Sequence, residues 1–299
     1  MVRKKSVSGM IFDTFNYIFL TLLALVCLYP VYHVLIGSFS DPVQLTRHYG
    51  AILKPLGFSL EGYKVVFHNP NIWSGYANTL FYVVVGTLCR MLFTLVGAYL
   101  LSRKDFAIRK GLTFIMVFTM YFSGGMIPSF LVVKMLRLYD SRAAIILPTL
   151  ISTWNMIIMK TALQAVPDAL EESARLDGAN DLVVLFQILV PVVKATIAVI
   201  ALYYIVGEWN SWFNAMVYLP HTTWQPLQLY LRRIRVQGNV DLTVELATAE
   251  EVCAAQENAI SNSQLKYTVI IVSSLPMIIA YPFFQKYFVK GVMLGSLKE

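Results

Sequence analysis

Long apolar runs alternate with shorter polar segments along the chain. A helix that crosses the hydrocarbon core of a bilayer needs about 20 mostly apolar residues, and it satisfies its backbone hydrogen bonds internally. Six runs meet this requirement, and they cover residues 17–39, 78–101, 111–133, 143–163, 190–209 and 267–287. The pattern predicts an all-α membrane protein with six transmembrane helices.

Composition supports the membrane prediction and excludes an ordinary soluble domain. Of the 299 residues, 57% are hydrophobic and only 14% are charged, whereas soluble domains are about 25% charged. The net charge of +7 follows from basic loops of the kind that orient membrane proteins, so it requires no nucleic acid partner.

The basic residues indicate the orientation of the spans. Lys and Arg gather in residues 1–16, in the loop 102–110 and near the C-terminus. With six spans these segments fall on one side, which the positive-inside rule makes cytoplasmic. We therefore expect a cytoplasmic N-terminal tail at 1–16, a transmembrane domain at 17–287 and a cytoplasmic C-terminal tail at 288–299. The domain then contains a cytoplasmic loop at 164–190 and an outer segment at 210–266.

The loop 164–190 reads as a short helix, an elbow and a second helix. Pro167 suits the first turn of a helix, and the acidic residues that follow it, including Glu172, suit the positive end of the helix dipole. Gly178 predicts a left-handed turn that ends the helix. Asp181 is then placed to cap the second helix.

Two interpretations of the first loop helix remain open on the residues alone. The first is an interfacial helix that rests on lipid headgroups, although such helices usually have a basic polar face. The second is a docking helix for a partner, because Leu170, Ser173 and Ala174 share a face on which a partner's backbone has room to approach.

Residues 172–191 resemble the EAA loop of ABC importer permeases. That motif has Glu-Ala-Ala, three residues, Gly, nine residues and Ile-x-Leu-Pro, and here it reads Glu172-Ser173-Ala174, Gly178 and Ile188-Leu189-Val190-Pro191. Every spacing is kept, and the departures at Ser173 and Val190 are mild.

Other segments are similar to the carbohydrate branch of these permeases, which includes the second permease subunit of maltose transporters. They include "NTLFYVVVGTL", "EWNSWFNAMVYL" and "YPFFQKYFVKGVMLGSLK". The segment "SGGMIPSFLVVKMLRLYDSRAAIILP" resembles the oligosaccharide subgroup of aldouronate and alginate type. The resemblance implies a type I ABC importer permease fold in a bacterial inner membrane.

The resemblance also implies a mechanism. In that family the first loop helix is a coupling helix that sits in a cleft of a cytoplasmic ATPase, and the C-terminal tail reaches toward the ATPase dimer. The coupling residues implied here are Glu172, Ser173, Ala174, Leu176, Asp177, Gly178, Ile188 and Pro191. The implied tail contacts are Gly291, Gly295 and Lys298. A frayed terminus is the alternative for the tail, and a solvated first-turn residue is the alternative for Glu172.

The partners follow from the same resemblance. No phosphate-binding Gly-x-x-x-x-Gly-Lys-Ser/Thr motif occurs in the sequence, so we expect ATP and Mg²⁺ in a separate ATPase and no cofactor bound by this chain. The chain is expected to be a transport subunit and not an enzyme. Its expected partners are a second related permease, two ATPase copies, an extracytoplasmic sugar-binding protein, the oligosaccharide substrate and lipid.

Candidate substrate residues lie in and after the fifth span. Aromatic rings and polar side chains are the groups that bind sugars, and they occur together at Glu208, Trp209, Asn210, Trp212 and Phe213. An interfacial aromatic belt explains the rings equally well. Asn155 lies mid-span in the fourth apolar run, and polar groups at that depth tend to face a cavity or the bundle interior.

Arg90 is the most costly residue predicted within a span. One interpretation is that it lines a cavity that would suit an acidic sugar. The other, which we favour, is a structural ion pair with a carboxylate or a location nearer an interface. The main rival to an ATP-driven permease is a secondary transporter or channel, which would carry its ion ligands inside the spans.

Overall fold

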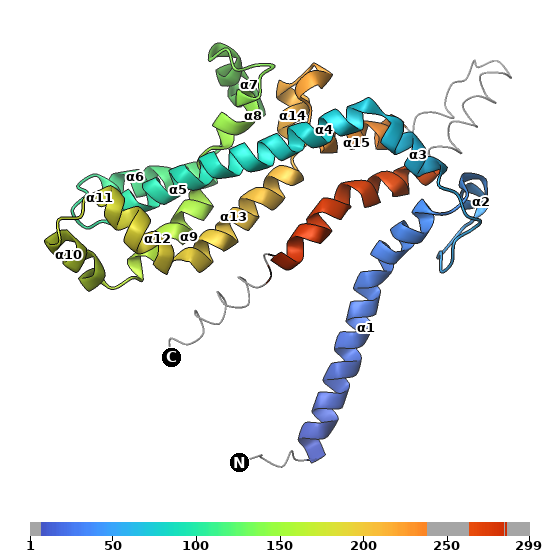
Figure 1. Ribbon diagram of the computed structural model, residues 1–299, viewed down its shortest axis with the longest axis horizontal. Coiled ribbons are helices and arrows are strands. Elements are labelled where there is room, and N and C mark those ends of the chain that lie inside the picture. The colour runs from blue at the N-terminus through green and yellow to red at the C-terminus, as the bar shows by residue number, and fades with distance from the viewer. Residues whose placement is uncertain (1–6, 238–262, 284, 286–299) are drawn as a thin grey trace. The chain divides into compact units, whose positions relative to one another are not determined.

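The computed structural model describes residues 7–237, 263–283 and 285, and every regular element within them is a helix (Figure 1). This confirms the all-α prediction for that part of the chain. The tail residues Gly291, Gly295 and Lys298 lie outside the described residues, and so does most of the outer segment beyond Gln237.

Three helices are long and apolar enough to cross a membrane, and three bent helix pairs bring the number of candidate spans to six. The straight candidates are Gly9–Ser38, Pro70–Ser102 and Ser263–Phe283. The bent pairs are Arg109–Tyr121 with Met126–Met135, Ala143–Thr149 with Thr153–Gln164, and Asp181–Val192 with Lys194–Trp209. The predicted apolar runs 111–133, 143–163 and 190–209 are therefore broken helices.

The contacts divide the chain into two units, one made of residues 1–69 and 233–275 and the other of 70–232 and 276–299. The first unit contains α1 (Val7–Ser38), α2 (Pro42–Arg47), α3 (Glu61–His68) and the start of the helix Ser263–Phe283. The first helix thus begins at Val7, before the expected start at Tyr17.

A buried amide joins the segments of the first unit. The side chain of Gln264 donates to the carbonyls of Ser38 and Ser59 at 3.1 and 2.8 Å, and it accepts from the backbone N–H of Gly62 at 3.1 Å. Both the amide nitrogen and the amide oxygen of Gln264 are therefore hydrogen-bonded, as expected for a side chain that is 1% exposed.

The second unit holds the remaining helices. One continuous helical segment is made of α4 (Pro70–Phe81), a π-helical turn (Tyr82–Gly86) and α5 (Thr87–Ser102). After it come α6 (Arg109–Tyr121), α7 (Met126–Met135), α8 (Ala143–Ile146) and α9 (Thr153–Gln164). The loop helix α10 (Asp168–Leu176) is followed by α11 (Asp181–Val183), a π-helical turn (Val184–Leu189), α12 (Val190–Val192) and α13 (Lys194–Trp209). The last helices are α14 (Phe213–Tyr218) and α15 (Leu227–Gln237), and residues 233–237 of α15 are assigned to the first unit.

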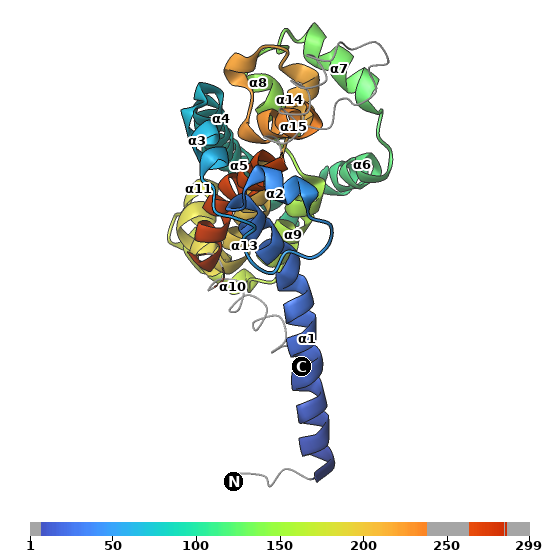
Figure 2. The ribbon, with the colours of Figure 1, turned by 90° about the vertical axis from the view of Figure 1, so that its right-hand side faces the viewer.

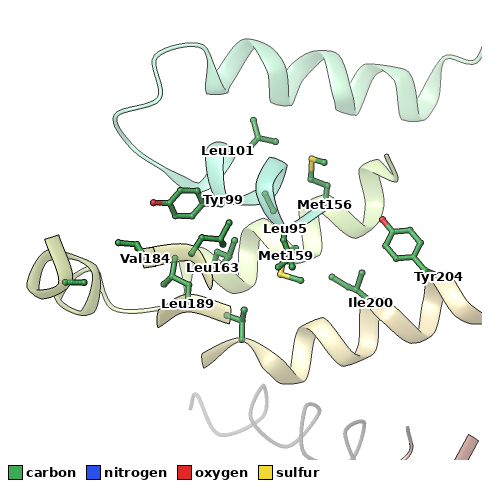
Figure 3. Close-up of a cluster of buried hydrophobic side chains, with 14 residues drawn as sticks. Leu95, Tyr99, Leu101, Met156, Met159, Leu163, Val184, Leu189, Ile200 and Tyr204 are labelled. Atoms are coloured by element: carbon green, nitrogen blue, oxygen red, sulfur yellow. The ribbon is translucent and has the colours of Figure 1, made fainter. Parts of the chain in front are cut away.

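An apolar core binds α5, α9 and α13 together (Figure 3). Its members are the fully buried side chains of these helices and of the segment that follows α11; they include Leu95, Met159, Leu163, Leu185, Leu189 and Ile200. The core also takes in Ala174 of α10, so the loop helix is packed onto the membrane helices of its own chain.

The breaks between helix halves have different causes. Between α6 and α7 the chain bends by 120°, at a segment that contains Gly125 with φ +83°. Glycine adopts this conformation without the steric penalty that a Cβ would bring. The 88° bend before α13 occurs at Val193. Pro191, two residues earlier, is the nearest residue in the sequence that would indicate a bend. The predicted single helix from residue 190 to 209 is therefore wrong in its first turns.

Candidate functional site

The loop helix α10 begins and ends at the signals in its sequence. Pro167 precedes its first residue, and Asp168 and Glu171 occupy its first turn. Helix α10 and α11 lie at one end of the second unit, and α14 lies at the opposite end (Figures 1 and 2). The polar loop therefore forms a distinct feature at one end of the helix bundle.

Gly178 ends α10 in a left-handed conformation, with φ +83°. The N–H of Ala179 donates to the carbonyl of Ala174, and the N–H of Gly178 donates to that of Arg175, both at 3.0 Å. These two bonds are the Schellman cap, which satisfies carbonyls that the helix leaves free. A Cβ added at Gly178 meets nothing within 4 Å, so the conformation alone selects glycine here.

A charged network anchors α10 to the end of α5. Arg103, directly after α5, forms an ion pair with Glu171, and Arg175 donates to Glu171 at 3.1 Å and to Asp181 at 2.6 Å. The hydroxyl of Tyr99 donates to the same Asp181 oxygen at 3.0 Å. Burial lowers the pKa of Arg103 from its ordinary value. The loop helix is thereby held to two neighbouring segments.

An exposed ion pair lies beside this network. Lys104 donates to Asp168 at 2.8 Å, with both side chains largely in solvent. The hydrogen bond and charge of Lys104 lower the pKa of Asp168, and those of Asp168 raise the pKa of Lys104. Any stabilisation from the aspartate is present above its ordinary pKa and is lost as the pH falls through the lowered one. Because exposed pairs contribute little, this one is a peripheral contact.

The exposed face of α10 carries Glu172, Ser173 and Leu176. All three are exposed, and Leu176 is 89% exposed. Glu172 also lines a cavity of about 600 Å³ together with the basic residues Arg103 and Arg109. A short helix with one face fixed in the core and an apolar residue presented at its end has the form of a docking element.

Two of the predicted loop features differ from the structure. Ala174 is buried in the core of the chain, so it leaves no room for a partner's backbone. The cap of the second helix is Asn180, whose side chain accepts from the N–H of Val183 at 2.9 Å, whereas Asp181 pairs with Arg175. Ile188 packs against the core, and Pro191 lies within α12; both link the loop to the bend before α13.

A second feature is a polar cavity of about 280 Å³ among α5, α9 and α13. Its lining brings together three of the residues predicted for the substrate pathway, Arg90, Asn155 and Glu208. The remaining lining residues are Ile145, Thr149, Ser152, Tyr203, Tyr204, Gly207, Ser211 and Asn214. The sequence predicted the three members separately, and the fold places them around one space.

Arg90 forms a buried ion pair with Glu208, and both side chains are at most 6% exposed. Its Nε donates to the carbonyl of Thr149 at 3.1 Å, and its Nη2 donates to the Thr149 hydroxyl at 2.6 Å. Arg90 thus has a carboxylate partner and also lines the cavity, and its role in the substrate pathway stays a prediction. Hydrogen bonds beyond the pair itself are what make a buried ion pair tolerable.

The other predicted pathway residues do not line the cavity. Trp209 is buried and its ring lies 6.3 Å from that of Tyr76. Asn210 donates from its side chain to the carbonyl of Val206 at 2.9 Å, so it caps its own helix. The rings of Trp212 and Phe213 contact each other edge to face. These residues stay predictions for another part of the pathway.

Comparison with known proteins decides the family. The family described as "Binding-protein-dependent transport system inner membrane component" matches residues 91–294. The chain belongs to this family. It is a multi-pass membrane permease, and the prediction of an ABC importer permease is confirmed.

Relatives of this permease are transport proteins for saccharides. It is 40% identical to the polygalacturonan/rhamnogalacturonan transport system permease protein YtcP of Bacillus subtilis, over 96% of this chain and 98% of the relative. It is 24% identical to the arabinooligosaccharides transport system permease protein AraQ of the same organism, over 94% of each chain. Its fold matches a chain in the crystal structure of a bacterial ABC transporter involved in the import of the acidic polysaccharide alginate. That match has a TM-score of 0.82 and 34% identity, over 96% of this chain and 100% of that one.

Sequence reasoning missed the partners of the permease's charged residues. Glu171 and Arg103 make the main anchor of α10, but the motif draws attention to Glu172 instead. The apolar periodicity of α10 is a signal for the difference, since Glu171 and the buried Ala174 are three residues apart and share a face. Thr149 accepts two hydrogen bonds from Arg90 and so positions its guanidinium. Nothing in the sequence around Thr149 indicates that role.

Proposed function

We propose that this permease is the subunit of an ATP-driven importer of oligosaccharides that forms half of the translocation pathway. It takes its driving force from a separate ATPase through α10. The single observation that carries the coupling role is the two-faced construction of that helix. Its inner face is fixed by the Arg103–Glu171 pair and by Ala174, and its outer face presents Glu172, Ser173 and Leu176.

A displacement applied to the outer face of α10 would be carried into the membrane helices. The inner face is attached to the end of α5, and the chain continues through the Gly178 cap to α11 and the bend before α13. Both connections lead to helices that line the polar cavity. Fixed contacts between packed elements are what allow a local shift to become a movement of helices.

The proposed assembly contains this subunit, a second related permease, two ATPase copies that hold ATP and Mg²⁺, and an extracytoplasmic sugar-binding protein. Both termini and α10 face the cytoplasm, as the basic loops indicate. The tail residues Gly291, Gly295 and Lys298 are proposed to contact the ATPase as well. Oligosaccharides are the proposed substrate class because the relatives are named for the transport of polygalacturonan and arabinooligosaccharides and for the import of alginate.

Purification from the native membrane tests the proposal. The tagged permease is extracted in mild detergent, and the proteins that accompany it are identified by mass spectrometry. We expect an ATPase with a phosphate-binding loop and a second permease. Gly178→Asp should lose the ATPase and keep the second permease, because it distorts only the exposed end of α10.

Gly111→Asp is the matched control. Gly111 lies in the first turn of α6 without a positive φ and also has nothing within 4 Å of an added Cβ, so this variant should keep both partners. Recovery of the permease alone or as a homo-oligomer would overturn the proposal and favour a secondary transporter or channel.

A further inference from the structure

The polar cavity among α5, α9 and α13 is electrically balanced. Among the described residues that line it, Arg90 and Glu208 are the ones with ionisable acidic or basic side chains, and they pair with each other. The remaining polar lining consists of hydroxyl and amide groups. A carboxylate entering this space would compete with Glu208 for Arg90 and would leave two like charges together, which is unfavourable away from bulk water.

Asn155 contributes a side-chain amide to the lining of the cavity. The residue is only 6% exposed. Among the described residues its backbone N–H donates to the hydroxyl of Ser152, and its side-chain amide is left to the cavity that it lines. A molecule in that space can therefore donate to the amide and accept from it.

The free groups around the cavity are suited to hydroxyls. Within the part of the chain that is described, oxygen Oε1 of Glu208 accepts no hydrogen bond, and Arg90 uses three of its five N–H groups on Glu208 and Thr149. The side chains of Ser211 and Asn214 add further donors and acceptors. Each sugar hydroxyl both donates and accepts, so one ring can satisfy carboxylate, amide and hydroxyl groups together.

The size and the aromatic lining favour a single ring. A cavity of about 280 Å³ lies just below the range of about 300–1,000 Å³ that is typical of ligand pockets. Tyr203 contributes an aromatic side chain to the lining, on which the C–H face of a sugar can pack. A complete oligosaccharide would therefore place one of its units here.

We propose that this cavity is a recognition site, within this subunit, for the hydroxyl groups of one sugar ring, and that the Arg90–Glu208 pair keeps it neutral so that a substrate carboxylate adds no affinity. The proposal rests on the proposed function, because it names the chemical groups of the oligosaccharide that the translocation pathway would bind. Two of the relatives are named for acidic polysaccharides and one for arabinooligosaccharides. Recognition of hydroxyl groups and recognition of a carboxylate are therefore two chemistries to distinguish for this chain.

Protection of an introduced cysteine measures binding without relying on transport. The complete complex is purified with Cys27, Cys89 and Cys253 replaced by Ala and with Ser211→Cys as the reporter in the cavity. The rate of labelling by aminoethyl methanethiosulfonate is measured in the nucleotide-free and the vanadate-trapped states. The probes are α-1,4-galactotriose and α-1,4-trigalacturonate, which differ only in the oxidation of C6.

We expect saturating galactotriose to slow labelling at least tenfold in one of the two states, and trigalacturonate to protect no better. Adding Asn155→Ala should abolish the protection. Adding Thr161→Ala should leave it intact, because that hydroxyl donates to the carbonyl of Ile157 in its own helix and lies outside the lining. A reporter at Ser173→Cys, on α10, should show no protection by either sugar.

Two results would overturn the proposal. If neither sugar slows labelling of Ser211→Cys, the cavity is a water-filled structural space. If trigalacturonate protects more than tenfold better than galactotriose, the site reads the carboxylate. Failure of the proposed function is seen separately, as absence of an ATPase from the purified complex, and it does not depend on the labelling rates.

Discussion

Gly178 and Arg90 impose two different kinds of constraint on single positions. At Gly178 the backbone conformation is demanding and the surroundings are open, since φ is +83° and nothing lies near an added Cβ. At Arg90 the backbone is an ordinary helix and the surroundings are demanding, because the guanidinium is buried against Glu208 and Thr149. Substitutions at the two positions should therefore fail for different reasons.

Replacing Gly178 should destabilise the protein, and the loss should be greater for residues that adopt the left-handed conformation less readily. A residue with a Cβ in this conformation costs about 1–2 kcal/mol, and Asn tolerates it better than most. We expect Gly178→Ala to lower the thermal unfolding midpoint of the purified complex and Gly178→Asn to lower it less. A midpoint for Gly178→Ala equal to that of the unsubstituted chain would show that the positive φ does not constrain this position.

Removing one member of the buried ion pair should be worse than removing both. Arg90→Met leaves Glu208 buried without its partner, and such losses cost about 3–5 kcal/mol. Arg90→Met combined with Glu208→Leu replaces the pair by apolar groups and should recover much of the loss. Thermal unfolding of the two variants in the same detergent compares them. Equal midpoints would mean that the pair is not coupled in the folded protein.

Among the helices, α10 has the clearest division between an anchored and a free face. Arg103 and Arg175 hold Glu171 on the inner face, whereas Leu176 remains exposed at the end of the outer face. Lys104, next to Arg103 in the sequence, makes only the exposed pair with Asp168. These neighbours provide a direct comparison of a buried anchor with a surface contact.

Arg103→Ala should uncouple ATP hydrolysis from transport, and Lys104→Ala should not. Without Arg103 the helix loses its link to α5, so movement of α10 is no longer passed on. We expect sugar uptake per ATP hydrolysed in proteoliposomes to fall at least fivefold for Arg103→Ala and to stay unchanged for Lys104→Ala. Equal coupling ratios for the two variants would argue against the anchor.

The sequence predicted α10 well because its signals are local. Pro167, the acidic first turn and Gly178 each act within one turn of the chain, and the helix begins and ends beside them. Which carboxylate faces inward was not predictable in the same way. Glu171 and Glu172 are equivalent in composition, and only the packing of Ala174 onto the core fixes the rotation of the helix.

Over the whole molecule, apolar runs predict where helices occur but not how they are broken. The bend at Gly125 follows from a residue that permits a positive φ. The 88° bend at Val193 depends on packing of the segments on either side of it. The pairing of Arg90 with Glu208 likewise joins residues far apart in the chain, so the sequence supplied the candidates while the fold supplied their partners.

Site-specific photocrosslinking from Leu176 tests the coupling role of α10 most directly. A photoreactive amino acid is placed at Leu176 and, as a control, at Thr161, an exposed position on α9. After irradiation of native membranes, we predict a crosslink from position 176 to the ATPase, and none from position 161. Absence of the ATPase from the products of position 176, in membranes where the ATPase co-purifies with the permease, would contradict the proposal that α10 is the coupling element.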